Sequence, residues 1–118
     1  MNAMVRVATL LLHLFAAEVG SEIIDVRDRG PVDLRTFECR DINRSSLIRR
    51  VCYDRARGYL IVGINNVYDQ FCDLPPPTFD SLMGAPSMGQ FYNRNIIGVE
   101  SGGAYDCRSH RNPARSTS

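Results

Sequence analysis

Lysine is absent from this sequence: all 14 basic side chains of the 118-residue chain are arginines. The absence excludes chemistry that needs a lysine amine, such as a Schiff base or the lysine of a P-loop. No apolar run in the sequence reaches the length of about 18 residues that a membrane-spanning helix needs. The formal net charge of +1 argues against a nucleic-acid binder held mainly by bulk charge and against a disordered polyelectrolyte. The length and the 44% of hydrophobic residues therefore predict a single packed domain with one core.

The near-zero net charge hides an uneven distribution. Nine arginines stand against five acids between residues 27 and 57, whereas one arginine stands against four acids between residues 58 and 100. A basic face carrying Arg49 and Arg50 is typical of proteins that bind an anionic polymer, such as nucleic acid, lipopolysaccharide phosphate or cell-wall carboxylates. The simpler interpretation is that these arginines form local ion pairs and keep the surface soluble.

The first 21 residues have the pattern of an export signal. Arg6 precedes an apolar stretch, Val7 to Ala17, that is too short to span a bilayer. Val19-Gly20-Ser21 offers a cleavage site, and cleavage after Ala17 is a second option. We therefore predict a signal peptide over residues 1–21 and a periplasmic or secreted mature chain. The alternative is a short amphipathic helix packed on the domain.

The cysteines support export, because all four follow the predicted signal. An even number of cysteines in a small exported chain indicates two disulfides, and four cysteines allow three pairings. We favour Cys39–Cys52 with Cys72–Cys107. The reason is that Cys52 and Cys72 fall on predicted strands separated by a third. Zinc is the competing interpretation, because Cys107 and His110 have a C-x-x-H spacing, but no second paired motif exists and we predict no metal site.

The segment that follows the signal is predicted to be a lead-in arm, residues 22–44. A short β-like run, Glu22 to Val26, opens it. The stretch from Val32 to Ile42 is mixed in character and is predicted to be a loop or a turn of helix.

Three runs with strand composition follow the arm. They cover residues 46–54, 59–64 and 67–72, and short turns separate them. A five-residue turn that ends in Gly58 is suited to a hairpin between the first two runs. Three strands with short connections predict an antiparallel meander.

Two short helices are predicted after the strands. Pro75 to Pro77 cannot continue a ladder, and Thr78 can cap a first helix. Ser87 can cap a second helix over Met88 to Asn95. The segment from Ile96 to Val99 is predicted to be a final strand or an extended segment.

These elements predict an α+β fold: a small three-stranded antiparallel meander followed by two short helices and stabilised by disulfides. The chain divides into a signal peptide (residues 1–21), an arm (22–44), a compact domain (45–99) and a polar tail (100–118) that contains Cys107.

A set of residues between 45 and 98 resembles a known family. The set opens with Ser-Ser…Val-x-Tyr-Asp and closes with Ala-x-Ser-x-Gly-x-x-x-Asn. Its members are Ser45, Ser46, Ile48, Val51, Tyr53, Asp54, Leu60, Val62, Leu74, Pro75, Phe79, Leu82, Ala85 to Asn93, and Ile96. This pattern resembles the KTSC domain, which is named for its occurrence at the C-terminus of some lysyl-tRNA synthetases and also occurs as a stand-alone bacterial protein.

The resemblance implies a strand meander followed by short helices, and it implies nucleic acid as a partner, because RNA binding has been suggested for the family. The sequence departs from the family pattern where Asp69-Gln70-Phe71 replaces a central Tyr-x-Tyr. It also adds a signal-like N-terminus and four cysteines. An exported form would not meet cytoplasmic tRNA.

Two groups of residues join the arginine pair as candidate binding residues. Ser87 and Gly89 place a hydroxyl and free backbone N–H groups at a helix start, which suits a small anion, although an ordinary N-cap is the simpler interpretation. Tyr92 is predicted to lie at the surface with Asn93 and Arg94, where one aromatic ring with a polar rim suits recognition.

Tyr53, Phe71, Phe91 and Tyr92 are candidates for a stacking platform that binds bases or sugars. Tyr53, Phe71 and Phe91 alternate with core-facing aliphatic residues, so we predict that they belong to the core. The seven candidate binding residues are therefore Arg49, Arg50, Ser87, Gly89, Tyr92, Asn93 and Arg94.

Catalytic motifs are missing from the sequence. Gly-x-Ser-x-Gly, His-Glu-x-x-His and a glycine-rich phosphate loop do not occur, and His110 is the only histidine after the predicted signal. We therefore predict a non-enzymatic binding module for an anionic polymer or protein, without a cofactor. One alternative is RNA binding, as the resemblance implies. The second is a small hydrolase-like enzyme with His110 as its base.

Overall fold

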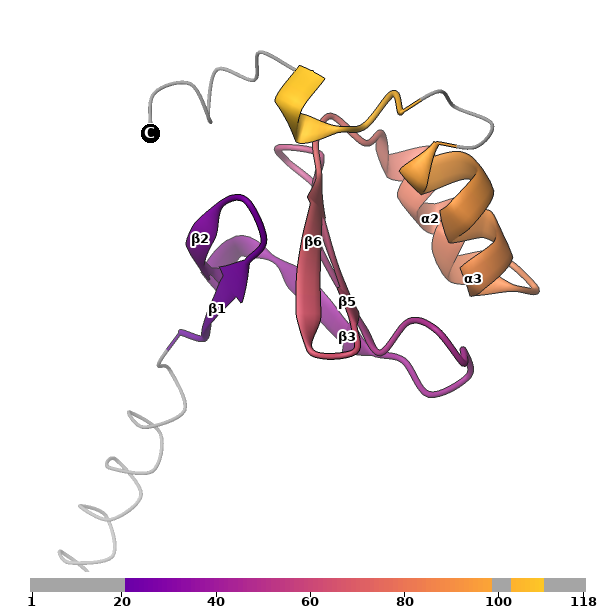
Figure 1. The fold of residues 1–118 in the computed structure, drawn as a ribbon, viewed down its shortest axis with the longest axis horizontal. Coiled ribbons are helices and arrows are strands. Elements are labelled where there is room, and N and C mark those ends of the chain that lie inside the picture. The colour runs from indigo at the N-terminus through magenta and orange to yellow at the C-terminus, as the bar shows by residue number, and fades with distance from the viewer. Residues whose placement is uncertain (1–20, 99–102, 110–118) are drawn as a thin grey trace, which may run out of the picture.

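The computed structural model describes residues 21–98 and 103–109. In this part of the chain a curled six-stranded sheet carries helices against one of its faces (Figure 1). The strands are β1 (Ile23–Val26), β2 (Gly30–Asp33), β3 (Glu38–Asp41), β4 (Arg50–Asp54), β5 (Tyr59–Ile64) and β6 (Val67–Phe71). The helical elements are η1 (Leu34–Thr36), α2 (Pro76–Gly84), α3 (Met88–Phe91), the π-helical η2 (Tyr92–Ile97) and η3 (Cys107–Ser109). The predicted α+β class is confirmed.

Several predictions fall outside the described residues. One is the signal peptide, of which only residue 21 is described. The others are His110 and most of the polar tail. Within the described ranges, no helix is long and apolar enough to cross a membrane.

The strand order in the sheet is β2-β1-β6-β5-β4-β3. The predicted meander is present as β4, β5 and β6, but the prediction of a three-stranded sheet is wrong, because strands from the arm extend both edges. All neighbours are antiparallel except β1 and β6, which run parallel with Val26 opposite Tyr68. The sheet is therefore mixed.

The arm forms strands because each of its segments pairs with a neighbouring strand of the sheet. β1 and β2 form a hairpin whose turn holds Asp28 and Gly30 at positive φ, 65° and 94°. β3 pairs with β4, and Cys39 lies opposite Cys52. The prediction of a loop or a turn of helix over residues 32–42 therefore holds only for η1, a single helical turn; the end of β2 and the whole of β3 flank it as strands.

Both faces of the sheet are buried. Successive side chains of a strand point to opposite sides, and a separate hydrophobic cluster packs on each side. On the helix-covered face, Val51 and Tyr53 of β4 join the cluster formed with α2, α3 and η2. On the other face, Cys52 and Ile61 pack with β1, β2 and Cys107.

Both predicted helices are present, with different ends. The first begins at Pro76 rather than after Thr78. Proline fits the first turn of a helix, because N–H groups there have no acceptor within the helix and proline lacks this group. Ser87 caps the second helix as predicted, with its Oγ accepting from the Gln90 N–H at 3.3 Å.

The predicted strand after the second helix is wrong. Ile96 lies in the π-helical η2, which continues directly from α3, and Val99 lies outside the described residues. Met88, Tyr92 and Ile96 recur every four residues and are all buried, so a helical face fills the core here.

Both predicted disulfides are confirmed: Cys39 is bonded to Cys52, and Cys72 to Cys107. The segment around the second bridge also pairs with β6, because the Cys72 N–H donates to the Tyr105 carbonyl at 2.8 Å. A disulfide sulfur cannot serve as a zinc thiolate, so the zinc interpretation of Cys107 is wrong.

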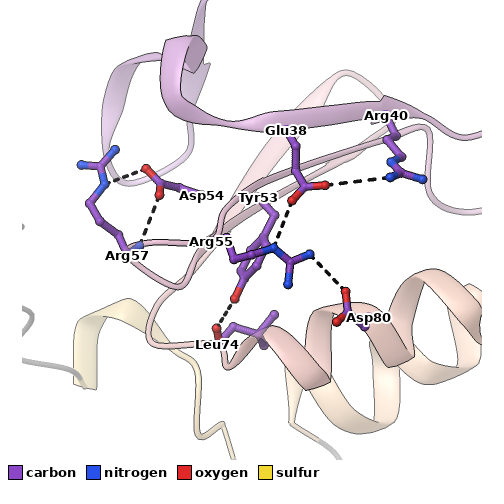
Figure 2. A network of polar contacts seen from close by, with 8 residues as sticks. All are labelled: Glu38, Arg40, Tyr53, Asp54, Arg55, Arg57, Leu74 and Asp80. Carbon is purple, nitrogen blue, oxygen red and sulfur yellow. Dashed lines mark hydrogen bonds and ion pairs between the residues drawn. The ribbon is translucent and has the colours of Figure 1, made fainter.

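A polar network joins β3, β4 and α2 at one end of the sheet (Figure 2). Arg55 donates from Nε to Glu38 at 3.3 Å and from Nη2 to Asp80 at 3.1 Å. Its guanidinium lies 5.6 Å from the ring centres of both Tyr53 and Phe79. The arginine thus covers the aromatic pair that holds α2 against the sheet.

Asp54 is a buried acid at the same end of the sheet (Figure 2). Its Oδ2 accepts hydrogen bonds from Thr36 Oγ1 and Arg57 Nε, both at 2.8 Å. Burial alone would raise the pKa of Asp54, but the hydrogen bonds from Arg57 and Thr36 outweigh it and hold the pKa below its usual value. The carboxylate ties η1 to the turn between β4 and β5.

Candidate functional site

A hollow of about 380 Å³ lies between the start of β4 and the turn that joins β5 to β6. We call it the arginine hollow. Among the described residues, its lining holds two guanidinium groups, two amides and one phenol, without a carboxylate. The lining residues are Arg49, Arg50, Gly63, Asn65, Asn66 and Tyr68.

The local sequence explains the shape of the hollow. Asn65 and Asn66 both adopt positive φ, 50° and 66°, which asparagine tolerates and which a two-residue hairpin turn requires. Tyr68 lies opposite Gly63 in the ladder, and a Cβ on this glycine would come within 2.9 Å of the tyrosine ring. The missing side chain therefore gives the ring its place beside Arg50.

Arg50 is held tightly by its neighbours. Its two terminal nitrogens donate to the carboxylate oxygens of Glu22 at 2.7 and 2.8 Å, and Asp41 lies 3.6 Å from its Nε. Hydrogen bonds with Glu22 and then with Tyr68 raise the pKa of Arg50. Its buried Nε has no hydrogen-bond acceptor among the described residues. Arg50 thus forms a fixed wall of the hollow. The neighbouring carboxylates largely compensate the charge of this arginine.

Arg49 supplies the uncompensated charge. Its side chain is exposed and forms no ion pair or hydrogen bond with any residue in the described ranges. Its backbone, by contrast, is fixed on both sides: its N–H donates to Gly63 at 2.9 Å, and its carbonyl accepts from Ile42 at 2.8 Å. A free guanidinium on a fixed backbone is suited to holding an anion.

The structure does not bring the seven candidate binding residues together, since only Arg49 and Arg50 line this hollow. Ser87 forms the ordinary N-cap of a four-residue helix. A Cβ on Gly89 would stand 3.7 Å from Leu47, so this glycine packs against the loop before β4.

The prediction of a surface position for Tyr92 is wrong. Its side chain is 2% exposed, and its ring packs edge-on against Phe71 with centroids 5.7 Å apart. Burial raises the pKa of Tyr92. Asn93 and Arg94 are exposed beside it, but the aromatic part of the predicted recognition surface lies in the core.

The core positions predicted for Tyr53 and Phe71 are confirmed, and Phe91 is partly buried against the same cluster. No stacking platform is therefore formed by these rings in the described part of the chain. The sequence prediction missed the contribution of the turn amides and Tyr68. Asn-Asn between two strands indicated the turn, but only the strand register places it beside Arg49.

The family model of the KTSC domain matches residues 44–99. This segment is a KTSC domain. The crystal structure of a KTSC domain protein from Yersinia pestis is similar to the chain, with 24% sequence identity and a TM-score of 0.49, and the match covers 52% of this chain and 87% of that one. No curated protein matches the chain.

The KTSC segment contains β4, β5, β6, α2, α3 and η2, and it contains the whole lining of the arginine hollow. The remaining strands, η1 and η3 lie outside the segment and are additions to it. Each disulfide joins a cysteine inside the segment, Cys52 or Cys72, to one outside it, Cys39 or Cys107. The bridges therefore attach the added segments to the KTSC domain.

Proposed function

We propose that this chain is an exported binding module without catalytic activity, and that its KTSC domain binds an anionic group in the arginine hollow. The observation that carries the proposal is the exposed Arg49 guanidinium, which has no partner in the described ranges and stands over a lining without carboxylates. Most other arginines of the described residues pair with acids, as Arg27 does with Asp69 and Arg55 with Asp80. Arg94 is also exposed without an ion pair in these ranges, but it does not line the hollow.

The proposed mode of binding uses one charge and several neutral donors. Arg49 presents its fork of N–H donors to two oxygens of a phosphate or carboxylate. The amides of Asn65 and Asn66 can donate to the remaining oxygens from the turn. Arg50 lies beside Tyr68 in the lining and adds positive potential. An anionic group on a polymer or on a protein surface fits this set.

The proposal of export draws on two features. Two disulfides are typical of an oxidising compartment, and the sequence begins with a signal-like segment. If the proposal is right, the protein recovered from its cells begins near residue 18 or 22. An intact Met1 on the recovered protein would contradict export.

The absence of catalysis is proposed because the described residues that line the hollow are arginines, amides, a glycine and a phenol, which form no nucleophile–base pair. The hydrolase alternative depends on His110. For the RNA alternative, the buried positions of Tyr53, Phe71 and Tyr92 leave no support for base stacking on these rings.

Titration of the oxidised protein with inorganic phosphate, followed by amide NMR, tests the proposed anion site. We expect saturable shifts centred on Gly63, Asn65 and Asn66, with weak affinity, on the order of a millimolar dissociation constant for a single ion. Shifts spread evenly over all exposed arginines, or no saturation, would contradict the site.

A further inference from the structure

A second hollow, of about 500 Å³, lies on the open side of β6. We call it the edge hollow. Both added segments reach it: the turn after β1 contributes Arg27 and Asp28, and the disulfide-bonded segment contributes Asp106 and Arg108. It shares no residue with the arginine hollow, so a function here is independent of the proposed anion site.

The backbone of β6 has a gap in its pairing at this hollow. The Tyr68 carbonyl accepts from the Arg27 N–H at 2.9 Å, and the Cys72 N–H donates to the Tyr105 carbonyl at 2.8 Å. Alternate residues of a strand direct their backbone groups to the same side, so Gln70 directs its N–H and carbonyl to this open edge as well. Within residues 21–98 and 103–109, no backbone group pairs with them there.

The gap is one residue wide. Arg27 already pairs with the Tyr68 carbonyl and Tyr105 with the Cys72 N–H, so within the described ranges the outward groups of Gln70 are the free ones between two positions about 13 Å apart, at about 3.3 Å per residue. Unpaired groups of an edge strand are a template for an added strand, and main-chain pairing of this kind is an established mode of peptide recognition.

Apolar side chains line the helix side of the same hollow. Phe71 and Tyr92 are buried with their rings packed edge-on, and Ile97 is 48% exposed beside them. Ile97 is among the few large hydrophobic side chains that the described surface exposes. An aliphatic side chain of a bound strand would cover it.

The charges of the edge hollow favour a basic neighbour. Arg27 pairs with Asp69 at 2.6 Å, and Arg108 pairs with Asp106 at 2.9 Å. Asp28 accepts no hydrogen bond from the described residues and is exposed. Among the described residues the lining therefore carries three acids and two arginines, and Arg108 acts on Asp28 through charge alone. A positive side chain complements the remaining negative charge.

We infer that the edge hollow binds an extended segment of a partner protein, which pairs its main chain with Gln70, covers Ile97 with an aliphatic side chain and places Lys or Arg near Asp28. The disulfide between Cys72 and Cys107 holds one wall of the site. Specificity comes from the apolar contact and the charge, and affinity comes from the main-chain hydrogen bonds.

The test uses the oxidised full chain and a blocked peptide, acetyl-alanyl-leucyl-alanyl-arginine amide, with its glutamate counterpart as the control peptide. Proline at an edge position removes an outward N–H without removing a ladder bond to β5, so Gln70→Pro deletes the proposed donor. Gln70→Ala is the matched control. It loses the hydrogen bond from Tyr59 to the glutamine side chain, 2.6 Å long, but keeps the backbone N–H.

We expect the arginine peptide to shift the amides of Gln70, Ile97 and Arg108, and to bind Gln70→Ala as it binds the wild type. Gln70→Pro should weaken binding by about tenfold, since a buried carbonyl of the peptide loses its donor. Ile97→Ser, at a position where the side chain is 48% exposed, should also weaken it. Equal affinity for both glutamine variants, no preference over the glutamate peptide, or shifts from a neutral oligosaccharide in place of the peptide would overturn the inference.

Discussion

Replacing Cys72 and Cys107 together by serine should lower the free energy of unfolding by about 4 kcal/mol, because the bridge closes a long loop in the unfolded chain. The sequence separation of this pair is 35, against 13 for Cys39 and Cys52. Cys72 and Cys107 are 1% and 2% exposed, so their segment belongs to the core and its release exposes apolar surface. For a domain that is stable by about 5–15 kcal/mol, this is a large fraction.

The matched control is the double serine variant at Cys39 and Cys52, for which the shorter loop predicts a loss of about 3 kcal/mol. Urea unfolding of both variants, each with its other bridge intact, gives the two values. The intact mass of the unmodified protein should be four hydrogens below that of its reduced form. A smaller effect at Cys72 and Cys107 than at Cys39 and Cys52 would show that the C-terminal segment is a loosely attached appendage.

Tyr53→Ala should cost about 3–5 kcal/mol, as truncation of a large buried aromatic side chain does. Tyr53 is 0% exposed, and its ring stacks on Phe79 with centroids 4.2 Å apart and planes 13° apart. Its hydroxyl donates to the Leu74 carbonyl at 2.6 Å (Figure 2). The truncation removes the ring contact between β4 and α2, and the guanidinium of Arg55 loses one of the two rings that it covers.

Tyr53→Phe separates the hydrogen bond from the ring. The ring stack survives, but the buried carbonyl of Leu74 loses its donor, at a cost of about 1–2 kcal/mol. Tyr59→Phe is the control, since the Tyr59 hydroxyl donates to a partly exposed glutamine side chain that can turn to water. Thermal unfolding of the three variants should rank them Tyr53→Ala, Tyr53→Phe, Tyr59→Phe in decreasing loss. A loss for Tyr53→Phe no larger than for Tyr59→Phe would contradict the role given to Leu74.

The sequence was sufficient to predict the part of the fold that depends on local pattern. Alternating apolar residues predicted β5, and the Asn-Asn pair predicted the turn that follows it. Ser87 predicted the helix start. The disulfide pairing was also predictable, because it follows from strand order: β5 separates the strand of Cys52 from the strand before Cys72.

The rest depends on contacts between distant segments. β3 has no alternating pattern, and what makes it a strand is pairing with β4. β1 joins β6 in parallel through one opposed pair, Val26 and Tyr68, which no local signal indicates. The polar neighbours of Tyr92 predict a surface position, whereas its four-residue spacing from Met88 and Ile96 puts it on the buried face of the helix.

The candidate site was predictable only in part. Two adjacent arginines marked the hollow, but the sequence cannot show that Glu22 compensates Arg50 while Arg49 has no acidic partner among the described residues. That difference follows from the hairpin of the arm, which brings Glu22 across to β4. The tyrosine and aspartate of the family pattern, Tyr53 and Asp54, serve the core and the β4–β5 turn instead of a binding surface.

The most direct measurement of the proposed function compares phosphate binding by Arg49→Ala and Arg94→Ala. Both arginines are exposed and form no ion pair in the described ranges, but only Arg49 lines the arginine hollow. We expect Arg49→Ala to lose about tenfold in affinity, the size of one charge-assisted contact, and Arg94→Ala to bind as the wild type does. An equal loss in both variants, or none in Arg49→Ala, would contradict a specific anion site.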